Sequence, residues 1–311
     1  EPAPQRLLVG QVMHEFDIHL LADLCYVVLA LFMLLVAKLT LNLCTPFDLD
    51  DELSSRDNPA FGISLIGYYL GVVIVFLGAI YQEESMVEAE AAAEGGAGAA
   101  LNFDHFFVDL GVDALWVLGA ILLLNAARVL LDVVVLRGFS AKKEIVEDRN
   151  AGVGAVEFGT YVSSALVVAG AISGQGGGWH TTLVFFLLGM GALTGFALAY
   201  QQLVSYDLLR ELEADNVAAG VAYGGNLIAL GVVILRGSGG SFTSWEEHLE
   251  RFAIYLVFAL LLLTVGRFVV DRAFFPGRTL HEEIAQDRNL NAGYLEGGLL
   301  LGLASIVAFA T

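Results

Sequence analysis

The chain has 311 residues, of which 57% are hydrophobic and only 16% are charged, and its formal net charge is −19. Soluble domains are typically about 45–50% apolar and about 25% charged, so this composition excludes an ordinary soluble globular protein. We expect a protein of the lipid bilayer, with no nucleic-acid partner and no cofactor.

Eight apolar runs follow one another along the chain. Each reaches the roughly 20 residues that a helix needs to cross a hydrocarbon core of about 30 Å. Buried helices of a large soluble protein could mimic one or two such runs, but not eight in series. The runs cover residues 19–44, 60–82, 108–136, 151–173, 180–204, 217–236, 251–275 and 291–311.

A short pattern, Asn-x-x-x-Gly-x-x-x-x-Gly, occurs four times, each time at the start of an apolar run. Repetition at this fidelity marks a duplicated unit, here an apolar run, a polar linker with the motif, and a second apolar run. An acidic residue precedes each Asn by five or six positions; these residues are Glu52, Glu144, Glu211 and Glu283. The four motifs are Asn58/Gly62/Gly67, Asn150/Gly154/Gly159, Asn216/Gly220/Gly225 and Asn289/Gly293/Gly298.

The motif has a structural explanation that involves no chemistry. Asn caps a helix N-terminus by accepting hydrogen bonds from exposed N–H groups. The first Gly comes one helical turn later, where a missing side chain lets another helix approach closely. Capping and packing together therefore account for the whole pattern. The expected close-approach positions are Gly62, Gly154, Gly220 and Gly293.

The second and fourth repeats share charged residues inside their apolar runs, at a constant offset of 139 residues. The first and third repeats have Leu65 and Tyr223 where the other two have Glu. This pattern predicts a tandem duplication of a four-span unit made of two unlike hairpins, with halves at residues 1–173 and 174–311. The matching charges are Arg128 with Arg267, Asp132 with Asp271, and Glu157 with Glu296.

Ionisable groups inside a span cost at least about 2.5–3.5 kcal/mol each at mid-bilayer, so they are normally paired and face the bundle interior. A rise of about 1.5 Å per residue puts Arg128 and Glu157 at similar depths in adjacent helices. We therefore expect Arg128 to pair with Glu157 or Asp132, and Arg267 to pair with Glu296 or Asp271. Such pairs could be interhelical glue or sites on an ion or proton path.

Lys and Arg residues are unequally distributed between the two sides of the predicted membrane protein. The four motif linkers lie on one side and carry nine of them, whereas the opposite side, with both termini, has three. The positive-inside rule therefore predicts cytoplasmic motif linkers and external termini.

The first linker and its flanks contain Lys38-Leu39-Thr40, Thr45-Pro46-Phe47-Asp48-Leu49 and Asn58-Pro59-Ala60. These segments resemble the bacterial inner-membrane proteins of domain of unknown function 350, the YjfL-like proteins. The resemblance implies four spans in two repeats, here present twice over, and an envelope-stress role by association only. Proline occurs in the first and fourth linkers alone, and the third linker is one residue shorter.

The expected fold is all-α: a polytopic membrane protein with eight transmembrane helices, in four helical-hairpin repeats arranged as two pseudo-symmetric halves. Neither a Ser/His/Asp set, a P-loop nor clustered Cys/His residues occurs in the sequence, so we expect no enzyme. The first functional hypothesis is a conduit or transporter for protons, small cations or polyamines. The alternative is a scaffold whose cytoplasmic linkers, residues 47–53 and 280–284, recruit envelope-stress proteins. The sequence leaves the oligomeric state open.

Overall fold

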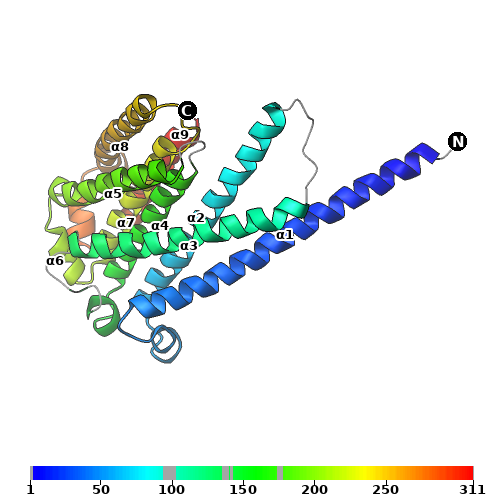
Figure 1. Ribbon diagram of the computed structural model, residues 1–311. Helices are drawn as coiled ribbons and strands as arrows, with labels where there is room; N and C mark the ends of the chain where they lie inside the picture. The colour runs from blue at the N-terminus through cyan, green and yellow to red at the C-terminus, as the bar shows by residue number, and fades with distance from the viewer. Residues whose placement is uncertain (1–2, 94–102, 135–139, 141–142, 174–177, 311) are drawn as a thin grey trace.

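The computed structural model describes residues 3–93, 103–134, 140, 143–173 and 178–310 of the chain. Throughout these ranges the regular structure is helical, without strands (Figure 1). The α-helices are α1 (Ala3–Cys44), α2 (Pro59–Ala93), α3 (Phe103–Val134), α4 (Ala151–Ile172), α5 (Gly178–Leu203), α6 (Leu208–Glu213), α7 (Val217–Ser238), α8 (Trp245–Phe274) and α9 (Leu290–Ala310). Three π-helical turns lie in the linkers: η1 (Asp51–Ser55), η2 (Lys143–Glu147) and η3 (Glu282–Gln286).

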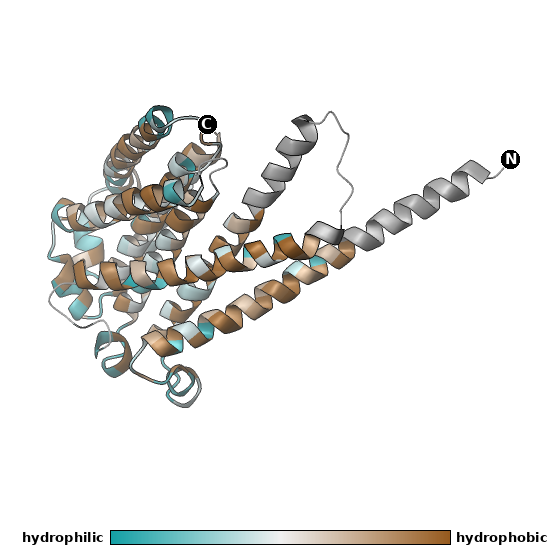
Figure 2. Cartoon of the chain, viewed as in Figure 1, coloured by the Kyte–Doolittle hydropathy of each residue, from teal (hydrophilic) through white to brown (hydrophobic). Residues whose placement is uncertain are grey.

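Eight of the described α-helices, all except the short α6, are long and apolar enough to cross a membrane. Figure 2 shows hydrophobic residues along all of the long helices. The prediction of eight spans in an all-α membrane protein is therefore confirmed. The protein is a multi-pass membrane protein.

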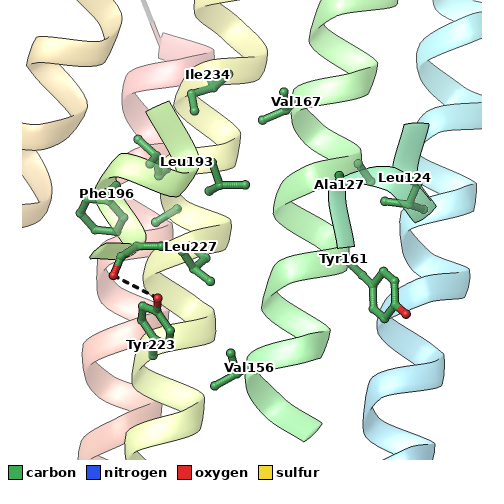
Figure 3. Packing of buried hydrophobic residues seen from close by; sticks show 14 of the residues in the cluster. Leu124, Ala127, Val156, Tyr161, Val167, Leu193, Phe196, Tyr223, Leu227 and Ile234 are labelled. Carbon is green, nitrogen blue, oxygen red and sulfur yellow. Dashed lines mark hydrogen bonds between the residues drawn. The ribbon is translucent and has the colours of Figure 1, made fainter. Parts of the chain in front are cut away.

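The motif-bearing helices of the four repeats form one continuous row in the order α2, α4, α7, α9 (Figure 3). The other helix of each hairpin (α1, α3, α5 or α8) lies outside this row. In an 18-residue apolar stretch of each helix, 89% of the residues are buried in α4 and 72% in α7, compared with 17% in α1. The two central helices thus form the core, and the outer helices present their apolar side chains to lipid.

Apolar side chains fill the spaces between the row and the outer helices. In Figure 3, Leu193 of α5 lies near Leu227 of α7, and the Tyr223 hydroxyl donates a hydrogen bond of 3.1 Å to the carbonyl oxygen of Ala197. Tyr223 and Leu193 are both fully buried. Since the hydrophobic cluster contains residues of all the row helices, the two halves of the sequence share one core.

The four linkers lie at the same end of the bundle. The Asn58 side chain donates to the carbonyl oxygen of Ile145, and the Asn150 side chain donates to that of Leu212. Asn216 in turn donates to the carbonyl oxygen of Ile284. These bonds connect the linkers in series, which confirms the prediction that all four share one side of the protein.

The one-residue difference in linker length corresponds to a difference in the type of helical turn. The spacing from the linker acid to the motif Asn is six residues in the first, second and fourth repeats and five in the third. The three longer linkers contain π-helical turns, whereas the third contains the ordinary α-helical turn α6. A π-helical turn closes its hydrogen bond over one additional residue, so both linker lengths bring the acid to the same place.

Candidate intramembrane carboxylate sites

Each motif Asn organises a small hydrogen-bond network at the start of a row helix. The Asn150 Oδ1 atom accepts from the backbone N–H of Val153 at 3.0 Å, which caps α4. Its Nδ2 atom donates to Glu144 Oε2 at 2.9 Å and to the carbonyl oxygen of Leu212 at 2.6 Å. Both Asn150 and Glu144 are buried. The linker acid therefore holds the capping residue in place, a role that the sequence pattern alone did not assign.

The same network recurs in the other repeats. Asn58, Asn216 and Asn289 donate to Glu52, Glu211 and Glu283 at 3.0, 2.9 and 2.7 Å. The Oδ1 atoms of these residues accept from the backbone N–H groups of Phe61, Ala219 and Asn291, respectively.

The residue before each motif Asn has a left-handed backbone, with φ between 48° and 55°, as at Arg149 and Arg288. This conformation is unfavourable for a side chain such as Arg. The hydrogen bonds of the adjacent motif Asn stabilise this backbone conformation.

The first Gly of the motif lets neighbouring row helices meet backbone to backbone. A Cβ atom on Gly220 would lie 2.1 Å from the carbonyl oxygen of Gly152. Similarly, a Cβ on Gly154 would lie 2.6 Å from the carbonyl oxygen of Ala60. Hydrogen bonds and close packing thus give the motif a structural role in joining consecutive repeats.

The first Gly of the fourth repeat makes the same contact, but that of the first repeat does not. Gly293 is buried, and a Cβ on it would lie 2.5 Å from the carbonyl oxygen of Ala218 on α7. Gly293 is therefore a packing position between α7 and α9. The expectation that every first motif Gly meets another helix is wrong at Gly62, where a Cβ would meet no atom within 4 Å. The reason is that α2 begins the row, so within the chain no row helix precedes it.

The carboxylate of Glu296, on α9, lies in the interior of the second half. Its side chain has no exposed surface, and Oε1 accepts from Tyr200 at 2.7 Å and Asn226 at 3.2 Å. Arg267 of α8 also donates to Oε1 through Nη1, forming an ion pair. Four helices therefore converge on a single carboxylate oxygen: α5, α7, α8 and α9.

Arg267 lies between this carboxylate and an open cleft of about 550 Å³. Its guanidinium donates to the Tyr200 hydroxyl at 3.0 Å and lies 5.5 Å from the centre of that ring. Tyr206, just beyond the end of α5, is also buried, and burial raises the pKa of its phenol. The cleft is lined by Leu203, Ser205, Thr264, Arg267, Phe268, Asp271, Thr279, Leu280 and His281.

Glu157, on α4, occupies the equivalent position in the first half. Its Oε2 atom accepts a short hydrogen bond from Ser64 of α2. Its Oε1 atom lies 4.0 Å from Nη2 of Arg128, and the Arg128 guanidinium lies 5.9 Å from the centre of the Tyr161 ring. A cavity of about 20 Å³ adjoins the site and is lined in part by Arg128, Glu157 and Tyr161. That volume accommodates about one water molecule.

The two sites have one property in common despite their different neighbours. Glu296 Oε2 and Glu157 Oε1 are buried and accept no hydrogen bond within the described part of the chain. Buried carboxylate oxygens normally have donors, so each of these atoms can accept a proton or contact a cation.

The expected ion pairs are present in both halves, Arg128 with Glu157 and Arg267 with Glu296, whereas the alternative partner Asp271 makes a different contact. Asp271 does not join Arg267 and Glu296; its Oδ1 atom accepts from the backbone N–H of Leu280 at 2.6 Å. That bond attaches the end of α8 to the following linker. The side chain of Asp132 lies outside the described residues. Sequence reasoning missed the partners Ser64, Tyr200 and Asn226, since neutral polar residues give no distinctive signal within an apolar run.

The linker segments proposed as a recruitment surface bury several of their apolar side chains. Leu280 and Ile284 are 2% and 0% exposed, and Leu49 is 3% exposed. In the first linker, Leu53 is 49% exposed and Phe47 is partly exposed. The fourth linker therefore presents neither of these apolar side chains to a peripheral partner.

Comparison with known proteins agrees with this architecture. The family model described as Domain of Unknown Function (DUF350) matches residues 16–172 and again residues 176–311. A UPF0719 transmembrane protein of Aquifex aeolicus (strain VF5) is 22% identical over 268 residues, which cover 83% of this chain and 88% of the relative. No solved structure gives a significant match.

Proposed function

We propose that this chain, which belongs to the DUF350 family, is a proton or small-cation conduit that uses Glu157 and Glu296 as its ionisable groups. The observation that carries the proposal is the pair of buried carboxylate oxygens without a hydrogen-bond donor in the described part of the chain, one in each half. Intramembrane acids are costly and commonly mark ion and proton pathways. We propose no enzymatic activity.

The surroundings of the two carboxylates support the proposal. Each has a nearby arginine, and Arg267 makes a direct ion pair with Glu296. A space adjoins each site, beside Glu157 in the first half and beside Arg267 in the second.

The sizes of the two spaces favour a proton over a larger cargo. The cleft beside Arg267 measures about 550 Å³, but the cavity beside Glu157 only about 20 Å³. A polyamine does not fit in a space that accommodates about one water molecule. A proton can move through such a space by exchange with water.

We also propose that the protein lies in the bacterial inner membrane, with its motif linkers in the cytoplasm. The excess of Lys and Arg on the linker side supports this orientation. Labelling of Ser54→Cys, in a linker, by a membrane-impermeant thiol reagent tests it, in a variant in which Cys25 and Cys44 are Ser. The proposal requires labelling only after the cells are opened.

The functional test is proton flux in liposomes loaded with a pH-sensitive dye and energised by a potassium gradient with valinomycin. We expect the intact protein to acidify the lumen and Glu157→Gln/Glu296→Gln to lower that rate at least tenfold. Gln keeps the volume and hydrogen bonding of Glu but cannot ionise. Glu144→Gln is the matched control, because it changes a buried acid that belongs to the capping network.

Unchanged flux in the double variant would contradict the assigned residues. Flux of the intact protein no higher than that of protein-free liposomes, for protons, K⁺, Na⁺ and a polyamine alike, would overturn the conduit proposal.

The scaffold alternative receives less support. Its recruitment surface included the fourth linker, where Leu280 and Ile284 are buried against the bundle.

A further inference from the structure

Consecutive repeats meet through the same two surfaces at every internal junction. We call these the Asn face and the carbonyl face. The Asn face of one repeat comprises the motif Asn and the second motif Gly. The carbonyl face of the next repeat comprises the linker carbonyl that this Asn contacts, the first motif Gly, and the residue eight positions after its own motif Asn.

Hydrogen bonds define the polar part of each junction. Asn58, Asn150 and Asn216 each donate to a carbonyl oxygen of the next linker at 2.6–2.8 Å. All three Asn residues are at most 3% exposed. The acceptor residues Ile145, Leu212 and Ile284 are equally buried, at 0–3% exposure.

Glycine contacts define the apolar part. A Cβ on Gly67 would lie 2.6 Å from Cα of Phe158. At the following junctions, a Cβ on Gly159 would lie 2.3 Å from Cα of Gly224, and one on Gly225 would lie 2.6 Å from Cα of Gly297. The second motif Gly of each repeat thus meets the same position of the next repeat.

The fourth repeat has an Asn face with nothing bound to it. Asn289 is partly exposed, and within the described residues its side-chain amide donates to Glu283 but to no linker carbonyl. A Cβ on Gly298, the second motif Gly, would meet no atom within 4 Å. Neither the polar contact nor the glycine contact of the other junctions is therefore made here.

The first repeat has a vacant carbonyl face. Leu53, which corresponds to Ile145, Leu212 and Ile284, is 49% exposed. A Cβ on Gly62 would meet no atom within 4 Å, although the equivalent first glycines all touch a neighbouring backbone. Ile66, the residue eight positions after Asn58, is 50% exposed.

We infer that a second copy of this chain occupies each vacant face, so that the Asn face of one copy docks on the carbonyl face of the next. The predicted contacts are a hydrogen bond from Asn289 to the carbonyl oxygen of Leu53 and packing of Gly298 against Ile66. The open groove beside Gly298 suits the close approach of another helix. The two vacant faces are complementary because the chain already joins such faces three times.

A contact of this kind is heterologous, because it joins two different surfaces. It produces a closed ring when the rotation between copies closes and a linear array when it does not. In both cases the intact protein contains more than one copy.

Cysteine cross-linking tests the contact directly. In a background with Cys25→Ser and Cys44→Ser, one preparation carries Ile66→Cys and another carries Gly298→Cys. Mixing the two preparations in detergent, reconstituting them together and oxidising them should give a disulfide-linked dimer containing one chain of each kind. Each variant alone should give no more dimer than Val257→Cys, a control at a 57% exposed position on α8. No mixed dimer above that control level would overturn the inference.

The mass of the protein in nanodiscs provides an independent readout. We expect the intact chain to be oligomeric and Gly298→Leu to be monomeric, with unchanged helix content because the added side chain enters open space. Gly195→Leu, on α5, is the matched control, since a Cβ there also meets no atom within 4 Å. A monomeric intact chain, or equal masses for Gly298→Leu and Gly195→Leu, would contradict the proposed junction.

Discussion

At the residue scale, the charge of Glu296 determines how the second half is organised. Its side chain has no exposed surface, and three donors on three different helices are directed at one of its oxygens. An unpaired charge in this position would be strongly unfavourable, so Arg267 offsets an electrostatic cost that packing cannot remove. Glu157 has a looser arrangement, since Arg128 approaches only to 4.0 Å.

Arg267→Ala should therefore lower the free energy of unfolding in detergent by about 3–5 kcal/mol, because it leaves Glu296 buried and unpaired. Arg128→Ala should cost less, because the 4.0 Å ion pair is weaker. Chemical denaturation followed by circular dichroism measures both changes. Adding Glu296→Gln to Arg267→Ala should restore part of the loss; a double variant less stable than Arg267→Ala would show that the charge is not the cause.

At the scale of helices, close approach along the row depends on positions without side chains. The backbone of Gly220 on α7 rests on the carbonyl oxygen of Gly152 on α4, and Gly293 on α9 rests in the same way on α7. Gly62 occupies the same motif position on α2 but has open space beside it. The first motif Gly is therefore a close packing position inside the row, but it borders open space on the first helix of the row.

Gly220→Ala should destabilise the protein by about 1–3 kcal/mol, because the new methyl group forces α4 and α7 apart. Gly62→Ala, measured in the monomer, should be neutral or stabilising by up to about 1 kcal/mol, because Ala favours the helix and meets no neighbour within one chain. Thermal unfolding of the two variants in dilute detergent compares them directly. Equal effects of the two substitutions would refute the assigned difference in packing.

At the scale of the whole molecule, the junction between the two halves is the same kind of junction as those within each half. Asn150 on α4 joins the second and third repeats just as Asn58 joins the first and second. Protein covers most of α4 and α7, so separating the halves would expose polar and glycine-rich surfaces. The pseudo-symmetric halves are therefore parts of one structural unit.

Residues 1–173 and 174–311, expressed together as separate chains, should consequently assemble and co-purify through a tag on one of them. Gly220→Leu in the second piece should abolish co-purification, whereas Gly195→Leu should not. Recovery of the second piece is measured by densitometry. Two stable pieces that fail to associate would contradict a shared core.

The sequence predicted the features that depend on local spacing. The eight spans, the capping by residues such as Asn150, and the depth match between Arg128 and Glu157 follow from run lengths and helical rise. It did not predict the row of helices or the donors Tyr200 and Asn226, because these depend on which helices become neighbours. The contact of Asp271, the alternative partner of Arg267, was not predicted either, because its hydrogen bond from Leu280 depends on where the next linker turns.

The serial junctions also have a consequence for synthesis. The Asn58 amide donates to Glu52 of its own linker and to a carbonyl oxygen of the second linker, so the second contact cannot form until the ribosome has delivered the next hairpin. Chains fold from the N-terminus as they emerge, so each hairpin presents a docking surface that only its successor completes. Translation thus proceeds in the same order as assembly. A pause between hairpins would leave this docking surface open for as long as the pause lasts.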